Sequence, residues 1–169
     1  DVVFIGHYEN DGRDISIKYL IQNGINVKVL GTNWKKSKLD KSYINNPKYD
    51  LDYVKSLKMA KIALAFYSKL NEDVYTRRCF EIPATKTFLL CQNNYYLKNL
   101  FEIGKEIDVF ESNTDLLEKV YYYLRQYNLR KKMADKACCK VRNNYSNYHT
   151  AKQIINDIRL IKNIVAPLM

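Results

Sequence analysis

Two adjacent arginines and one glutamate, on a single turn of a predicted helix, are the residues here best suited to binding a charged ligand. Arg77 and Arg78 lie four and three residues before Glu81 in the stretch EDVYTRRCFEIPATKTFLL (72–90). On a helix these spacings bring the side chains to one face. A carboxylate can accept hydrogen bonds from two hydroxyls of a ribose, and guanidinium groups can face a diphosphate. This turn is therefore our first candidate for a nucleotide site.

The alternative for the same residues is an exposed salt bridge, which contributes only about 0.3–0.5 kcal/mol. That alternative does not explain Pro83, which costs about 3 kcal/mol in a regular helix. The apolar runs AKIALAFY and FLL on either side predict buried strands. Strands there place the start of the helix at the ligand-binding edge of a sheet.

A second candidate is the segment GHYENDGR (6–13), which follows the first apolar run and opens a predicted helix. Backbone N–H groups at a helix N-terminus can bind a phosphate, and Arg13 adds a planar, permanent cation. The spacing fits neither the dinucleotide fingerprint GxGxxG nor a P-loop. The alternative, that Gly12 only permits a turn, remains open from these residues alone.

Apolar runs alternate with helical patterns along most of the chain. The predicted strands and helices occupy, in turn, 1–6, 12–24, 25–31, 51–60, 61–67, about 75–85, 87–91, 94–101 and 106–112, followed by helical runs at about 115–129, 129–144 and 148–165. This alternation predicts one Rossmann-like α/β domain (1–169): an open parallel sheet of about five strands, helices on both faces and a helical C-terminus. The polar segment 32–52 is predicted to be a long loop. Ligands should then bind near the loops 6–14, 31–35 and 67–78.

The composition favours an anionic partner without indicating a nucleic-acid groove. Lys and Arg exceed Asp and Glu by 28 to 18, a net charge of +10, but the cations are spread along the chain and accompany no nucleic-acid motif. Four Cys and two His without a CxxC argue against a metal cage. No apolar run is long enough to span a membrane and no signal peptide is present. We therefore expect a cytoplasmic protein with reduced thiols.

Three other residues leave alternatives open. Asp50 and Asp52 form a DxD triplet, which can hold a metal on a nucleotide-sugar but here more simply begins a helix. Trp34 is compatible either with stacking on a base or with core packing.

Several stretches together resemble one family. RCFEIPA (78–84) is similar to the R-x-F-E-x-P-A motif of group 1 glycosyltransferases, in the branch named after spore-maturation protein B. DVVFIG with its downstream Arg13, VKVLGTNW (27–34), LFEIGKEIDVF (100–110) and the helical segment 115–141 resemble further parts of that branch. The resemblance covers nearly the whole chain.

The resemblance implies a GT-B enzyme with two Rossmann-like domains, of which this chain is the C-terminal, donor-binding half. Glu81 matches the carboxylate that binds the donor's ribose, and Asp73 matches a second acid close to the transferred sugar. Arg78 and Arg13 match cations near the diphosphate. The implied catalytic residues are Asp73 and Arg78, and the implied nucleotide-sugar-binding residues are Gly6, Arg13, Arg77, Arg78, Glu81 and Lys86.

Two departures from the family pattern leave open that this is a divergent or inactive member. Lys86 stands where the family has Gly; if that turn has positive φ, the strain is about 1 kcal/mol. Alternatively, Lys86 supplies a phosphate contact. The segment NNYSNYHTAK (143–152) lacks the family's Arg after its hydroxyl residue.

The sequence thus predicts a glycosyltransferase donor domain that transfers a sugar from a nucleotide-diphosphate-sugar to an unknown glycan, lipid or protein acceptor. Cations replace a metal at the leaving group, so neither metal nor cofactor is expected. The chain begins on a strand without Met, and we expect a fragment whose missing N-terminal half is needed for activity. The alternative is a non-catalytic module for a polyanion or protein partner. A receiver-like signalling domain is disfavoured, because Asp1 begins a strand instead of ending one.

Overall fold

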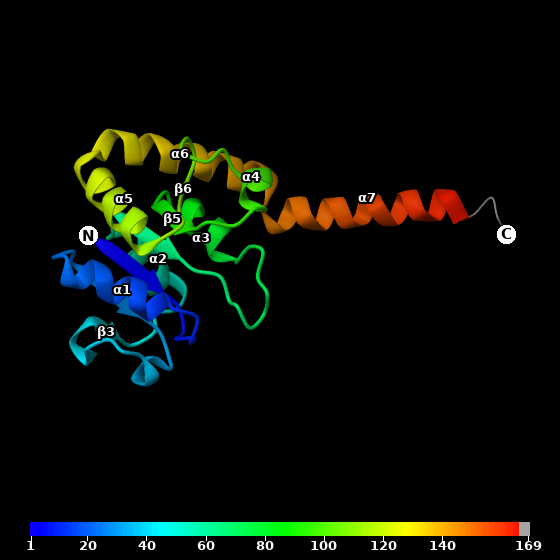
Figure 1. The fold of residues 1–169 in the computed structure, drawn as a ribbon. Helices are drawn as coiled ribbons and strands as arrows, with labels where there is room; N and C mark the ends of the chain where they lie inside the picture. Colours follow the sequence, from blue (N-terminus) through cyan, green and yellow to red (C-terminus); the bar gives the residue numbers. More distant parts are fainter. Residues whose placement is uncertain (166–169) are drawn as a thin grey trace.

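The computed structural model describes the backbone of residues 1–165 and the side chains of residues 1–161; residues 166–169 of the predicted domain lie outside this range. Six parallel strands form one sheet in the order β3-β2-β1-β4-β5-β6 (Figure 1). Their bounds are β1 Val2–Ile5, β2 Val27–Leu30, β3 Ile44–Asn45, β4 Ile62–Ala65, β5 Phe88–Gln92 and β6 Asp108–Phe110. The order reverses between β1 and β4, as in a Rossmann-type sheet.

Helices connect the strands and cover both faces of the sheet. They are α1 Arg13–Gln22, α2 Asp50–Lys58, α3 Arg78–Ala84, α4 Leu97–Leu100, α5 Asn113–Arg125, α6 Tyr127–Asn144 and α7 Asn147–Val165. Alternate strand residues point to opposite faces. Val2 and Phe4 therefore pack with α1 and α5, whereas Val3 and Ile5 pack with α2, α3, α4 and α6. The predicted Rossmann-like class, with helices on both faces and a helical C-terminus, is confirmed.

The sixth strand was missed by sequence reasoning. It lies in the segment predicted to be a loop, where Ile44 and Asn45 pair with Val29 and Leu30 of β2. Two short 3-10 turns, Trp34–Lys36 and Lys41–Tyr43, precede it. A two-residue strand in a polar segment leaves no hydrophobic run, so neither length nor periodicity indicates it.

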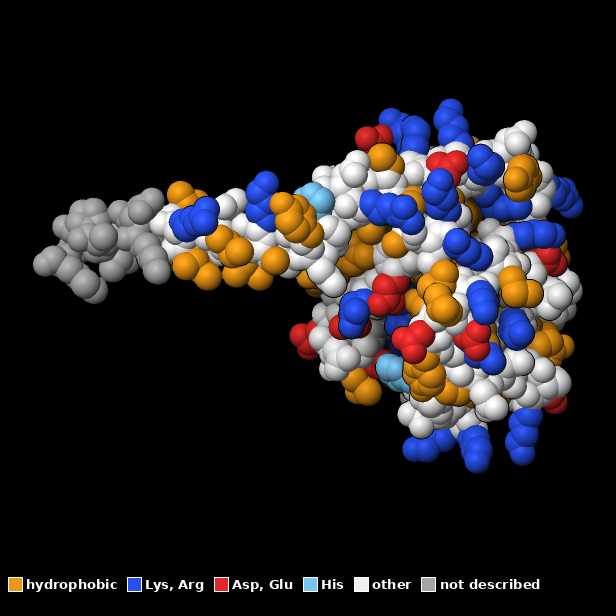
Figure 2. Space-filling model, turned by 180° about the vertical axis from the view of Figure 1, so that it is seen from behind, with side chains coloured by type: hydrophobic (Ala, Val, Ile, Leu, Met, Phe, Trp, Pro, Cys, Tyr) orange, Lys and Arg blue, Asp and Glu red, His pale blue; other side chains and the backbone are white. Residues whose placement is uncertain are grey.

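Helix α7 projects from the body of the domain as one straight helix (Figure 1). Exposed apolar side chains lie along this helix in Figure 2; they include Ile154, Ile155, Ile158, Leu160 and Ile161. Lys and Arg side chains are scattered over the body in the same view, as the sequence predicts. No helix in the described part of the chain has the length and apolarity needed to cross a membrane.

The turn between α3 and β5 has the positive φ that the family glycine suggested, with Lys86 at φ 61°. A side chain in this left-handed region costs about 1 kcal/mol relative to glycine. Lys86→Gly is therefore expected to raise the free energy of unfolding by about 0.5–1 kcal/mol, measured by urea denaturation. Lys86→Ala keeps the strained backbone and removes the same exposed ammonium group. An equal gain in both variants would show that the backbone is not the cause.

Candidate functional site

The strand order reverses between β1 and β4, and in open α/β sheets ligands bind in a crevice at the carboxyl edge beside such a reversal. The loop after β1 (6–12) and the loop after β4 (66–77) flank this crevice. Their backbones are linked through one buried side chain, because Glu9 accepts hydrogen bonds from Ser68 Oγ at 2.7 Å and from the backbone N–H of Leu70 at 3.2 Å. Glu9 therefore fixes the two loops to each other through hydrogen bonds.

Gly6 and Arg78 meet in this crevice. Arg78 is half-buried, and its Nε donates to the backbone oxygen of Ile5 at the end of β1. A Cβ on Gly6 would lie 2.9 Å from the ring of Phe4 and 3.1 Å from Nη2 of Arg78. Glycine at position 6 therefore leaves the space in which the guanidinium group lies. The structure brings these two predicted site residues together.

The carbonyl group of Gly6 is held from the other side by the turn after β2. Trp34 is 2% exposed, and its indole N–H donates to Gly6 O at 2.8 Å. Its ring also packs edge-on against Phe4, with centroids 5.7 Å apart. Of the two alternatives for Trp34, core packing is correct, because this buried ring has no face free for a base.

Arg13 lies beneath the loop after β1 and is only 5% exposed. Its guanidinium group bonds both carboxylate oxygens of Asp11, the backbone oxygen of His7 at 3.0 Å and Glu9 Oε2 at 3.1 Å. The group is therefore occupied by partners within its own loop. Glu9 was missed by sequence reasoning, although its i,i+4 spacing to Arg13 was a signal that could have identified the pair.

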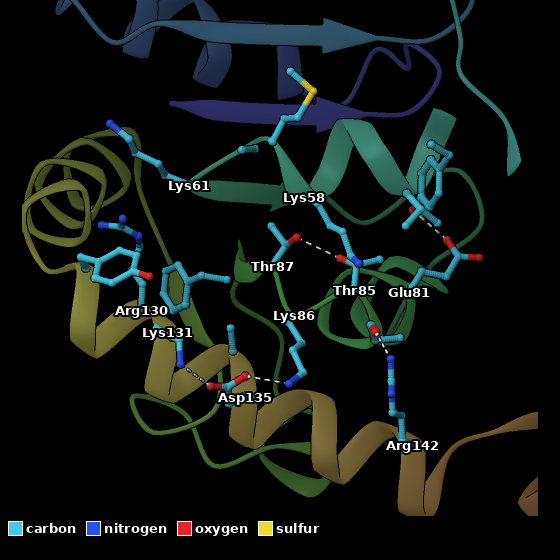
Figure 3. A pocket seen from close by; sticks show the side chains of 18 residues that line it. Lys58, Lys61, Glu81, Thr85, Lys86, Thr87, Arg130, Lys131, Asp135 and Arg142 are labelled. Atoms are coloured by element: carbon cyan, nitrogen blue, oxygen red, sulfur yellow. Dashed lines mark hydrogen bonds and ion pairs between the residues drawn. The ribbon is translucent and has the colours of Figure 1, made fainter. Parts of the chain in front are cut away.

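Glu81 lies on α3, and its side chain faces a groove between α2 and α3 (Figure 3). The side chain is 38% exposed; Oε2 accepts a hydrogen bond from the Tyr53 hydroxyl at 3.0 Å and Oε1 lies 3.4 Å from Nε of Arg77. Burial, together with the adjacent carboxylate, raises the pKa of Tyr53, so its hydroxyl remains a donor. Tyr53 lies 28 residues before Glu81 in the chain, and no local pattern indicates this contact.

Asp73 lies in the loop after β4, half-buried, where its Oδ2 accepts the backbone N–H of Ser68 at 3.2 Å. It closes a short turn at the carboxyl edge, near the loop that carries Glu9. Lys86 lies elsewhere. It belongs to the turn that precedes β5, at the amino edge of the sheet, and pairs with Asp135 at 3.3 Å. The structure therefore does not bring Lys86 to the crevice.

The acidic residues of the site do not form a metal cluster. In residues 1–161, no group of three or more His, Cys, Asp or Glu lies where it could hold a metal ion. Asp50 and Asp52 are in the first turn of α2, where Asp52 forms an exposed pair with Lys55 at 3.6 Å. The four cysteines are free thiols, and Cys139 is the exposed one among them.

Comparison with known proteins identifies the family. A family model described as glycosyl transferase-like matches residues 15–156. A search of curated proteins gave no sequence match.

Several solved structures share the fold at low sequence identity. Sucrose-phosphate synthase from Thermosynechococcus elongatus has a TM-score of 0.75 and 10% identity over 96% of this chain and 45% of its own. HepE from Anabaena, solved with UDP-glucose, has a TM-score of 0.72 and 12% identity over 94% and 48%. The catalytic domain of a cholesterol-alpha-glucosyltransferase from Helicobacter pylori has a TM-score of 0.65 and 16% identity over 84% and 96%. This chain spans less than half the length of the first two proteins.

The family match runs from α1 into α7 and includes the RCFEIPA turn that carries Arg78 and Glu81. Together with the parallel sheet and its reversal between β1 and β4, it shows that this chain belongs to the glycosyl transferase-like family.

Proposed function

We propose that this domain binds a nucleotide-diphosphate-sugar at its carboxyl edge and presents the sugar for transfer to an acceptor, without a metal. One observation carries the proposal: the partly exposed Glu81 carboxylate lies three residues along the same helix whose first residue, Arg78, lies against Gly6 at the switch point. A carboxylate and a guanidinium group three residues apart on one helix suit a ribose and a diphosphate, respectively.

In this proposal the ribose hydroxyls take the places that Tyr53 and Arg77 hold at Glu81. Arg77 is 91% exposed on its side chain and moves readily to the phosphates once it leaves Glu81. Arg78 faces the diphosphate from the crevice. Negative charge develops on this leaving group during transfer, so fixed cations there stabilise the transition state. Arg13, whose charge is compensated by Asp11 and Glu9, holds the loop after β1 in place and does not itself bind the diphosphate.

Asp73 is proposed to contact the transferred sugar, from the turn that it closes with Ser68. The proposal also includes an acceptor and a second Rossmann-like domain that complete the enzyme. It further places the chain in the spore-maturation-protein-B-like branch and the protein in the cytoplasm. The branch is supported by the motif RCFEIPA and by the matching segments on either side of it.

Titration calorimetry with UDP, GDP and their sugars tests this function. We expect one nucleotide series to bind and Glu81→Gln to weaken it at least about tenfold, because one amide oxygen cannot accept both hydroxyls as a carboxylate does. Glu118→Gln is the matched control, since this exposed glutamate lies on α5, away from the crevice. Equal affinity in all three proteins would contradict the role of Glu81.

The alternative, a non-catalytic module for a polyanion, predicts a different result in the same experiment. No heat would accompany any nucleotide, whereas random RNA would bind with a strong salt dependence that UDP or GDP does not relieve. That combination, in a folded sample, would replace the proposal with the alternative.

A further inference from the structure

In the free domain, both oxygens of the Glu81 carboxylate already have a donor from the protein itself. The Tyr53 hydroxyl donates to Oε2 at 3.0 Å, and Nε of Arg77 lies 3.4 Å from Oε1. A dashed line at Glu81 marks the first of these contacts in Figure 3. The carboxylate that the proposed function assigns to a ribose is therefore occupied before any ligand arrives.

The two internal donors differ in the strength of their contact with Glu81. The Arg77 side chain is 91% exposed, and such an exposed ion pair contributes little, because water and salt screen it and the long side chain must be ordered. Tyr53 is half-buried on α2, and its hydroxyl donates to a charged acceptor, which makes this hydrogen bond one of the stronger kinds. Tyr53 is thus the donor whose loss a ligand has to offset.

The packing of Tyr53 fixes where its hydroxyl lies. The ring packs against the buried cluster that includes Leu57 on α2 and Ile82 on α3, so the hydroxyl cannot move far without moving the ring. The Glu81 side chain has several rotatable bonds and is 38% exposed. Any separation of the two groups must therefore come mainly from a turn of Glu81. Since most of this side chain is covered, two incoming hydroxyls find little free carboxylate surface beside the internal donors.

We propose that Tyr53 is a built-in competitor for the ribose and thereby limits how tightly the site holds its nucleotide. The inference rests on the proposed function, because it concerns the same carboxylate. The ribose hydroxyls replace Tyr53 and Arg77, so they bind less tightly than they would to an unoccupied carboxylate. Filling the site also opens the hydrogen bond that joins α2 to α3.

Tyr53→Phe removes the competing hydroxyl and keeps the packed ring. Titration calorimetry with UDP and with GDP should show that whichever of them binds does so about five- to tenfold more tightly than in the unchanged protein, because it no longer displaces a hydrogen bond to a charged group. Tyr122→Phe is the matched control. This tyrosine is 52% exposed on α5, across the sheet from α2 and α3, and its substitution should leave the affinity unchanged.

Urea denaturation with and without saturating nucleotide gives an independent measurement of the same competition. Without nucleotide, Tyr53→Phe should lower the unfolding midpoint, because the hydrogen bond to Glu81 is lost. At the same saturating nucleotide concentration the difference from the unchanged protein should nearly vanish, since Tyr53 has already left Glu81 in the bound domain. A tyrosine with only a structural role would lower the midpoint equally in both conditions and leave the affinity unchanged.

The outcomes separate this inference from the proposed function on which it rests. Equal or weaker nucleotide binding in Tyr53→Phe would overturn the inference and leave the proposed function intact, because Tyr53 would then stay on Glu81 or orient it for the ribose. A gain that Tyr122→Phe shares would also overturn it. Absence of binding in both measurements, for Tyr53→Phe and the unchanged protein alike, would reject the proposed function and this inference with it.

Discussion

Replacing Gly31 with alanine is expected to lower the free energy of unfolding by about 3 kcal/mol or more. Gly31 follows β2, and an added Cβ would lie 1.9 Å from the carbonyl oxygen of Gly6 and 2.6 Å from its carbon. Neither atom can move alone, since Gly6 N–H donates to Leu30 O at 2.9 Å and Gly6 O accepts from Trp34. The backbone must therefore shift at the end of two central strands.

Urea denaturation measures this loss as a lower midpoint at an unchanged slope. Gly104→Ala is the matched control, because Gly104 has φ +80° but its added Cβ would meet no atom within 4 Å. It should cost only the backbone strain of about 1 kcal/mol. A loss at position 31 no larger than that at position 104 would show that the close approach to Gly6 has no energetic consequence.

Glu9→Gln is expected to destabilise the domain by about 2–3 kcal/mol although it hardly changes the volume of the side chain. Glu9 is 7% exposed and accepts from Arg13 on one oxygen and from Ser68 and Leu70 on the other. An amide has only one acceptor oxygen, so its NH₂ group must face a donor in either orientation. The substitution therefore leaves buried donors unsatisfied on one side.

The same substitution should loosen the link between the two loops at the carboxyl edge. Faster amide hydrogen exchange at residues 68–73 would report this locally, beside the drop in stability from denaturation. Glu72→Gln removes the same charge from an exposed position in the second loop and should change stability by less than about 0.5 kcal/mol. Similar behaviour of the two variants would show that charge alone, and not the buried contacts of Glu9, explains the effect.

Local sequence patterns were sufficient to predict most of the strands and helices and their order along the chain. The alternation of apolar runs with helical periodicity predicted five of the six strands and all seven helices, since each signal lies within a few neighbouring residues. The positive φ at Lys86 also followed from one local comparison, because the family has glycine there. Sequence reasoning likewise placed Arg77, Arg78 and Glu81 on one short helix.

The tertiary structure alone decided which partners these residues have. The sequence predicted that Arg13 would face a phosphate, but the folded loop surrounds it with Glu9 and Asp11. Trp34, in the turn after β2, contacts Gly6 at the end of the neighbouring strand β1, and Lys86 faces α6 instead of the crevice. The contacts of Trp34 and Lys86 join segments tens of residues apart, and they depend on strand order and on the direction of each side chain. Periodicity carries no information about either, so the fold and the local pair of Arg77 with Glu81 could be predicted from the sequence, whereas contacts between distant segments could not.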